Sequence, residues 1–140
     1  MYDFLFHGGT VVDPSQGINR VTSVAVSGNR IAAVGDIAPE NAVTVIDASG
    51  YFLFPGLIDF HVHAYWGGTD TGCPVEISCI PNGVTSAVDA GSAGTANFRN
   101  FSTIMHHSHV RMKAQINISP IGIATKKFYE SVNPEHSDKE

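Results

Sequence analysis

The sequence is poor in cysteine and in charge, and it contains no long hydrophobic run. Its only two cysteines, Cys73 and Cys79, fit neither a redox C-x-x-C motif nor a zinc knuckle, so we expect free thiols in a reducing cytoplasm. Residues 1–7 have neither a basic region nor an apolar run of signal-peptide length. No segment approaches the length that crosses a bilayer. The sequence therefore predicts a cytoplasmic protein without a membrane-spanning helix.

Positive charge is also scarce, because 8 lysines and arginines oppose 13 aspartates and glutamates. The resulting net charge of −5 argues against nucleic acid and anionic membranes as partners. Apolar side chains are plentiful, since 43% of the 140 residues are hydrophobic. This length and composition suffice for one ordinary domain with a sizeable core.

Residues 1–50 are typical of short strands separated by turns. Gly8-Gly9 separates two apolar runs, and Gly28-Asn29 is a two-residue turn of the hairpin type between residues 23–27 and 30–34. We expect this part to form a small β-rich layer that serves as scaffold.

From residue 51 the pattern alternates between strands and helices, which predicts a parallel sheet. The apolar residues Phe98, Phe101 and Met105 recur at helical spacing and give the second helix one apolar stripe. The expected elements are strand 52–63, a short helix over 73–80 that Pro81 ends, strand 83–89, helix 95–107 and strand 110–119. Residues 124–140 are polar and resemble a loop or frayed tail.

A His-x-His sequence ends the first of these strands. Alternation along a strand places His61 and His63 on one face with Asp59, and Phe60 and Val62 on the other face, where helices would cover them. Two neighbouring imidazoles suit one divalent metal ion. The alternative is a pair of histidines hydrogen-bonded in a core. The glycine-rich segment 64–69 that follows resembles a flexible loop.

Polar residues also follow the next two strands. Asp89 and Ser92 follow one, and Asn117 and Ser119 lie at the end of the other. In a (β/α)₈ barrel the groups used for chemistry lie at the C-terminal strand ends, so Asp89, Ser92 and Asn117 are candidate substrate-binding residues. The alternative is that Asp89 and Ser92 only cap the following helix and shape a turn.

Residues 28–35, 55–59 and 61–63, in this order and spacing, resemble the opening of an amidohydrolase-superfamily enzyme. Residues 83–94 and 117–119 resemble its dihydroorotase-like branch, which includes amidohydrolase/deacetylase metallohydrolases. The resemblance covers residues 3–123 and implies an α/β fold. A small β-sandwich would be built from both chain ends, here from residues 1–50. Residues 51–123 would form the first two to three βα units of a (β/α)₈ TIM barrel, and 124–140 a polar tail or truncated loop.

The resemblance also implies a chemistry. His61 and His63 would ligate the more buried of one or two divalent ions, zinc first, with manganese, iron and nickel as alternatives. A metal-bound hydroxide would attack a small-molecule substrate and hydrolyse a C–N amide bond, of the deacetylase or cyclic amidase type, or a related ester. The full enzyme is expected to be a homo-oligomer.

The chain also departs from the family pattern, which requires a bridging lysine, two more histidines and an aspartate from later strands. Lys126 and Lys127 come too early for the bridging role, and we interpret His106, His107 and His109 as surface residues. The catalytic general base is expected beyond residue 140. We therefore expect an N-terminal fragment that is inactive alone; the alternative is a non-catalytic fragment or pseudoenzyme with a binding or assembly role.

Overall fold

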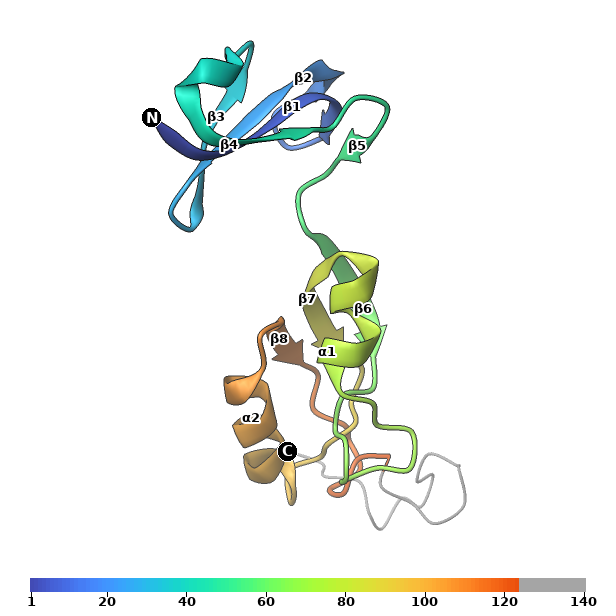
Figure 1. Ribbon diagram of the computed structural model, residues 1–140. Helices are drawn as coiled ribbons and strands as arrows, with labels where there is room; N and C mark the ends of the chain where they lie inside the picture. Colours follow the sequence, from blue (N-terminus) through green and yellow to red (C-terminus); the bar gives the residue numbers. More distant parts are fainter. Residues whose placement is uncertain (124–140) are drawn as a thin grey trace. The chain divides into compact units, whose positions relative to one another are not determined.

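The computed structural model describes residues 1–123, and the chain divides into two compact units, one of residues 1–55 and one that begins at Gly56 (Figure 1). The predicted polar tail at 124–140 lies outside the described residues. None of the helices within residues 1–123 is long and apolar enough to cross a membrane.

The first unit is one β-sheet with strand order β3-β2-β1-β4, and β5 also pairs with β1. The central strand β1 runs antiparallel to β2 and parallel to both β4 and β5. The elements of this unit are β1 (Tyr2–Asp13), β2 (Ile18–Ser27), β3 (Arg30–Gly35), the 3₁₀ helix η1 (Pro39–Asn41), β4 (Ala42–Asp47) and β5 (Phe52–Leu53). The β-rich layer expected from the sequence is therefore present.

The predictions for two glycine-containing dipeptides of this sheet, Gly28-Asn29 and Gly8-Gly9, have different outcomes. The hairpin at Gly28-Asn29 is confirmed, because Ser27 pairs with Arg30 and Gly28 has a φ of 58°. The prediction that Gly8-Gly9 separates two strands is wrong, because β1 continues through it. The register with β2 shifts there, and Gly8 has a φ of 75°, so the pair forms a bulge inside one long strand.

The second unit contains a parallel sheet with order β6-β7-β8. Helices connect its strands, as the predicted alternation requires, since parallel neighbours need a crossover connection. The elements are β6 (Leu57–Val62), α1 (Val75–Ser78), the 3₁₀ helix η2 (Ile80–Asn82), β7 (Val84–Asp89), α2 (Phe98–His107) and β8 (Arg111–Ala114). A complete barrel is not present in the described residues.

The core of this unit forms around the apolar stripe of α2. Phe101 is fully buried and stacks on Tyr65, with ring centroids 5.0 Å apart. Phe98 and Met105 pack against the same cluster, which confirms the predicted stripe. Tyr65 is thus a core residue, and the expectation that segment 64–69 is only a flexible loop is wrong for its first two residues, Ala64 and Tyr65, which are buried.

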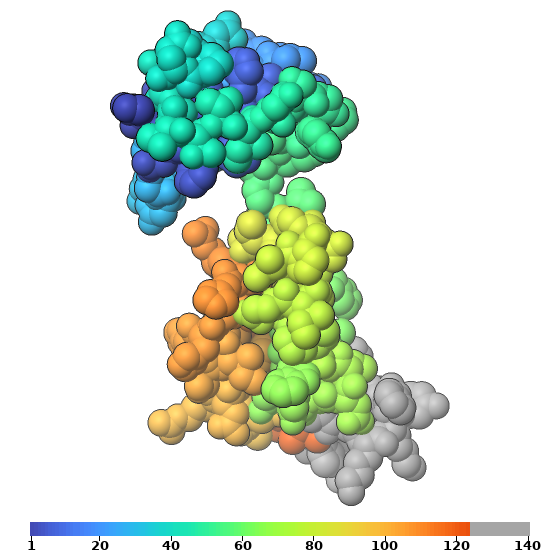
Figure 2. Space-filling model, viewed as in Figure 1, coloured from blue at the N-terminus to red at the C-terminus, as the bar shows by residue number. Residues whose placement is uncertain are grey.

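The two helices are linked on the surface of this unit. Figure 2 shows α1 in yellow-green and α2 in orange on one face, and a groove lies between them, lined by Val75, Glu76 and Ile104 among others. The Glu76 carboxylate accepts hydrogen bonds from the Ser108 hydroxyl at 2.7 Å and from the His109 backbone N–H at 3.0 Å. The bond from the Ser108 hydroxyl, and to a smaller extent the bond from the His109 N–H, lower the pKa of the Glu76 carboxyl.

Several predicted boundaries are corrected by the structure. The expected strand 52–63 is two strands, because β5 pairs with β1 of the first sheet whereas β6 begins at Leu57. The expected helix 73–80 is only four residues of α-helix, and Pro81 lies inside η2, where the first turn of a 3₁₀ helix tolerates a residue without an N–H.

The last predicted strand, 110–119, ends at Ala114 as β8. Beyond it the chain bonds to the loop that follows β7, because Asn117 donates its backbone N–H to the Ala93 carbonyl at 2.9 Å. Ile116 and Ile118 are consequently exposed. Phe60 is also exposed, by 72%, whereas Val62, predicted on the same face, is half-buried and packs against the core.

Candidate metal-binding site

The His-x-His sequence places two imidazoles side by side at the C-terminal end of β6. The rings of His61 and His63 lie 5.4 Å apart between centroids and are nearly perpendicular, at 86°. His61 is exposed and His63 is half-buried. Asp59 holds the strand locally, because its Oδ1 accepts the backbone N–H of His61 at 3.0 Å. The pairing of the two rings follows from strand alternation, as predicted.

This spacing fits a shared metal ion. With zinc–nitrogen bonds of about 2.0–2.1 Å and a tetrahedral angle, two imidazoles on one ion have centroids about 5 Å apart. Within residues 1–123 no group of three His, Cys, Asp or Glu side chains comes together in a way that could hold a metal. The pair therefore offers two donors of the chemistry that zinc prefers.

One ring nitrogen of His63 already has a partner inside the protein. Its Nδ1 lies 3.1 Å from the hydroxyl oxygen of Ser92, a fully buried residue in the loop after β7. This contact leaves Nε2 as the nitrogen of that ring without a hydrogen-bond partner among residues 1–123. The backbone carbonyl of His63 accepts the N–H of Cys73 at 2.9 Å, which closes the intervening loop onto the strand end.

The carboxylate of Asp89 is fully buried at the end of β7. Its Oδ2 accepts the backbone N–H of Ala64 at 2.7 Å, and its Oδ1 accepts that of Ser92, also at 2.7 Å. Asp89 thus connects the residue after His63 to the serine that contacts the His63 ring. The bond to Ser92, three residues on, is of the turn-shaping kind that the sequence left open as the alternative for Asp89, whereas the bond to Ala64 spans 25 residues.

Asn117 joins the same set of loops. Its side-chain amide donates to the Gly91 carbonyl at 2.9 Å, and its Oδ1 accepts the backbone N–H of Ser119 at 2.9 Å. Gly91 has a φ of 84°, and a Cβ there would lie within van der Waals distance of Asn117. The structure therefore brings the three candidate residues at the strand ends together with His63 in one hydrogen-bonded unit.

Sequence reasoning missed two residues of this unit. Ala64 takes part through its backbone N–H, which no side-chain pattern reveals. Asn97 accepts the Gly94 N–H at 2.9 Å and donates to the Ile121 carbonyl at 3.0 Å, which ties the start of α2 to the last described segment. An asparagine one residue before a helix was the available signal for Asn97.

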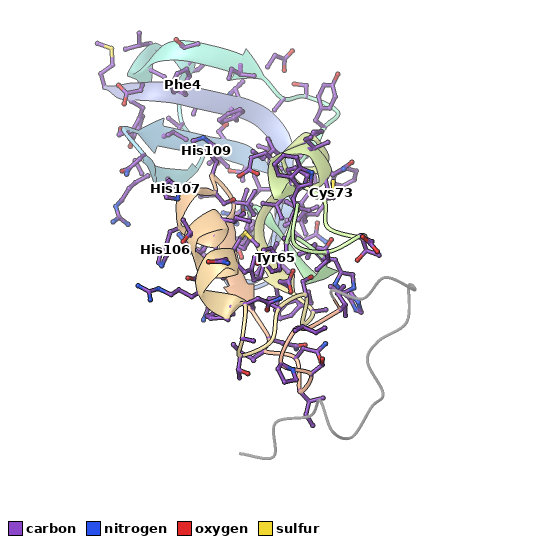
Figure 3. The ribbon with its side chains drawn as sticks, turned by 90° about the horizontal axis from the view of Figure 1, so that it is seen from below. Phe4, Tyr65, Cys73, His106, His107 and His109 are labelled. Atoms are coloured by element: carbon purple, nitrogen blue, oxygen red, sulfur yellow. The ribbon has the colours of Figure 1, made fainter. Side chains whose placement is uncertain are left out.

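The three other neighbouring histidines are surface residues, as predicted. His106 and His107 lie at the end of α2 and His109 just beyond it (Figure 3), and all three are exposed. The His107 ring bonds the Thr103 carbonyl of its own helix, with Nδ1 2.7 Å from the oxygen.

No family model matches the chain. Individual relatives do match it. The chain is 44% identical over 105 residues to a deacetylase of Agrobacterium fabrum, which is 73% of this chain and 26% of that protein. It is 32% identical over 133 residues to a dihydroorotase of Citrifermentans bemidjiense, which is 89% of this chain and 30% of that protein. The chain thus spans about a quarter to a third of the length of these relatives.

Solved structures agree with the sequence matches. A crystal structure of a dihydroorotase matches with a TM-score of 0.71 and 34% identity, over 89% of this chain and 33% of that one. A D-aminoacylase, whose structure concerns the role of a binuclear metal centre, matches with a TM-score of 0.53 and 34% identity, over 66% of this chain and 19% of that one. The resemblance predicted from the sequence motifs is therefore confirmed: the chain matches the N-terminal part of amidohydrolase-superfamily hydrolases.

Proposed function

We propose that this chain carries the first metal-binding strand of a metal-dependent hydrolase that cleaves a C–N amide bond, of the deacetylase or cyclic amidase type, or a related ester, in a small-molecule substrate. The observation that carries the proposal is the pair of imidazoles 5.4 Å apart at a parallel-strand end. The similarity to a deacetylase and to dihydroorotases supports the reaction class.

In this proposal His61 and His63 hold one divalent ion, with zinc preferred to manganese, iron or nickel because imidazole nitrogen is a typical zinc ligand. The binuclear centre named for D-aminoacylase supports a site of one or two ions. A divalent metal supplies an activated water and polarises the scissile carbonyl. The chain's own contribution is to hold the two rings at one strand end, with Asp59 bonded to the backbone of His61.

A catalytic zinc ion normally has three protein ligands and a water molecule. We propose that further ligands and the general base come from outside the described residues, that the 140-residue chain does not turn over alone, and that the complete hydrolase is a homo-oligomer. We also propose that Asp89, Ser92 and Asn117 lie where the substrate binds and contribute by holding the loops at these strand ends in place. Cys73 and Cys79 are free thiols, which supports the cytoplasm as the compartment.

The test is hydrolysis by the complete product of the gene that encodes the chain, purified with zinc. N-acetylated amino acids and cyclic amides are offered as substrates, and release of the carboxylate product is measured. We expect turnover of one of these classes, reduced to background by His61→Ala or His63→Ala and unchanged by His107→Ala, which removes an exposed histidine. A zinc-loaded product that hydrolyses neither class would contradict the proposal and favour a binding or assembly role.

A further inference from the structure

We infer that Ser92 and Asp89 are positioning residues that orient the His63 imidazole and keep its proton on Nδ1. The inference rests on the proposed metal role of His63. It assigns to these two residues an action through the histidine, where the sequence alone left open substrate contact or a role in capping the helix and shaping a turn.

First, the peptide group between His63 and Ala64 is held by hydrogen bonds on both of its edges. Its carbonyl, that of His63, accepts the N–H of Cys73, and its N–H, that of Ala64, donates to the buried Asp89 carboxylate. Hydrogen bonds to a charged acceptor are stronger than those between neutral groups. The position of the His63 Cα is therefore set by the protein, independently of any metal.

The second step concerns the ring. The Ser92 hydroxyl lies 3.1 Å from Nδ1, and the other Asp89 oxygen fixes the Ser92 backbone through a bond of 2.7 Å. One buried carboxylate thus sets both the backbone beside the histidine and the backbone of the residue that contacts its ring. Because Ser92 and Asp89 are fully buried, water does not compete for these contacts.

The third step concerns the proton. The group beside Nδ1 is the Ser92 hydroxyl, which can accept an N–H or donate its own O–H. With the proposed metal ion on Nε2 the ring proton lies on Nδ1, so in this proposal the hydroxyl oxygen accepts it. A proton held on Nδ1 leaves the Nε2 lone pair available to a metal. Partners that fix a ligand histidine in this way commonly change metal affinity by about 10–100-fold when removed.

The experiment uses the full 140-residue chain labelled with ¹⁵N in its histidines. The Nδ1 and Nε2 shifts are recorded without metal at a pH where imidazole is neutral, and the His63 signals are identified from their loss in His63→Ala. We expect Nδ1 to carry the proton in the wild type and the tautomer to move toward Nε2–H in Ser92→Ala. Zinc affinity, measured separately on the complete product of the gene, is expected to fall by about tenfold in Ser92→Ala.

The matched control is Ser119→Ala, because Ser119 is an equally buried serine whose hydroxyl has no hydrogen-bond partner among the described residues. It is expected to leave both the tautomer and the zinc affinity unchanged. A wild-type His63 protonated on Nε2, or an equal tautomer ratio in wild type and Ser92→Ala, would overturn the inference. The expected tautomer in the 140-residue chain, together with a complete gene product that binds no zinc, would instead overturn the proposed metal role, so the two failures are distinguishable.

Discussion

The Asp89 carboxylate accepts the backbone N–H of Ala64 at 2.7 Å across the ends of two parallel strands. The residues are 25 positions apart in the sequence, and the bond joins the end of β7 to the residue directly after the histidine pair. A buried carboxylate with both oxygens bonded to amides is a rigid connection, and the candidate site is built around it.

Asp89→Asn is expected to destabilise the second unit by about 1–3 kcal/mol. Asparagine offers one oxygen where aspartate offers two, so its NH₂ group faces one of the two backbone N–H donors and leaves that donor unsatisfied. Urea unfolding followed by the fluorescence of Trp66, the only tryptophan and a residue of this unit, measures the change. Asp70→Asn, at an exposed position of the same unit, is the control; equal unfolding midpoints for the two variants would contradict the role given to Asp89.

Phe101→Ala is expected to cost about 3–5 kcal/mol of unfolding free energy, because it removes the fully buried ring that stacks on Tyr65. Ile104→Ala, on the same helix but 37% exposed, is expected to cost clearly less. Thermal unfolding of the two variants by circular dichroism compares them. Similar losses in both would show that the helix is held by its groove-facing residues and not by the Phe101 ring.

Glu76→Gln is expected to lower stability slightly, by less than about 1 kcal/mol, and only above acidic pH. The pKa of Glu76 is lowered in the folded state by its bond from Ser108, so the carboxylate stabilises the fold above the unfolded-state pKa of about 4.3. That contribution is lost as the pH falls through the lower, folded-state pKa. Unfolding free energies at pH 7 and at pH 3 measure it, and a wild-type advantage that persists undiminished at pH 3 would argue against this explanation.

Local chemistry explains which features could be predicted from the sequence. The hairpin at Gly28-Asn29, the apolar stripe through Phe101 and the facing pair His61 and His63 depend only on short-range periodicity and turn chemistry. These features survive in the structure because no distant contact competes with them.

The remaining features depend on contacts between distant residues. Strand β8 ends early because Asn117 bonds to the loop after β7, and the bulge at Gly8 lies where the register between β1 and the distant strand β2 shifts. The partnership of Asp89 with the Ala64 backbone was also unpredictable, since every residue type except proline offers the same N–H. The position of Asp89 at a strand end was predictable, but the backbone N–H groups to which its carboxylate bonds were not.

Zinc titration of the complete gene product by calorimetry shows whether His61 and His63 hold a metal ion, with the wild type, His61→Ala, His63→Ala and His107→Ala measured in parallel. We expect one or two zinc ions per wild-type chain, a loss of at least about tenfold in affinity in either strand-end variant, and wild-type binding in His107→Ala. Equal affinity and stoichiometry in the wild type and in both strand-end variants would contradict this metal role.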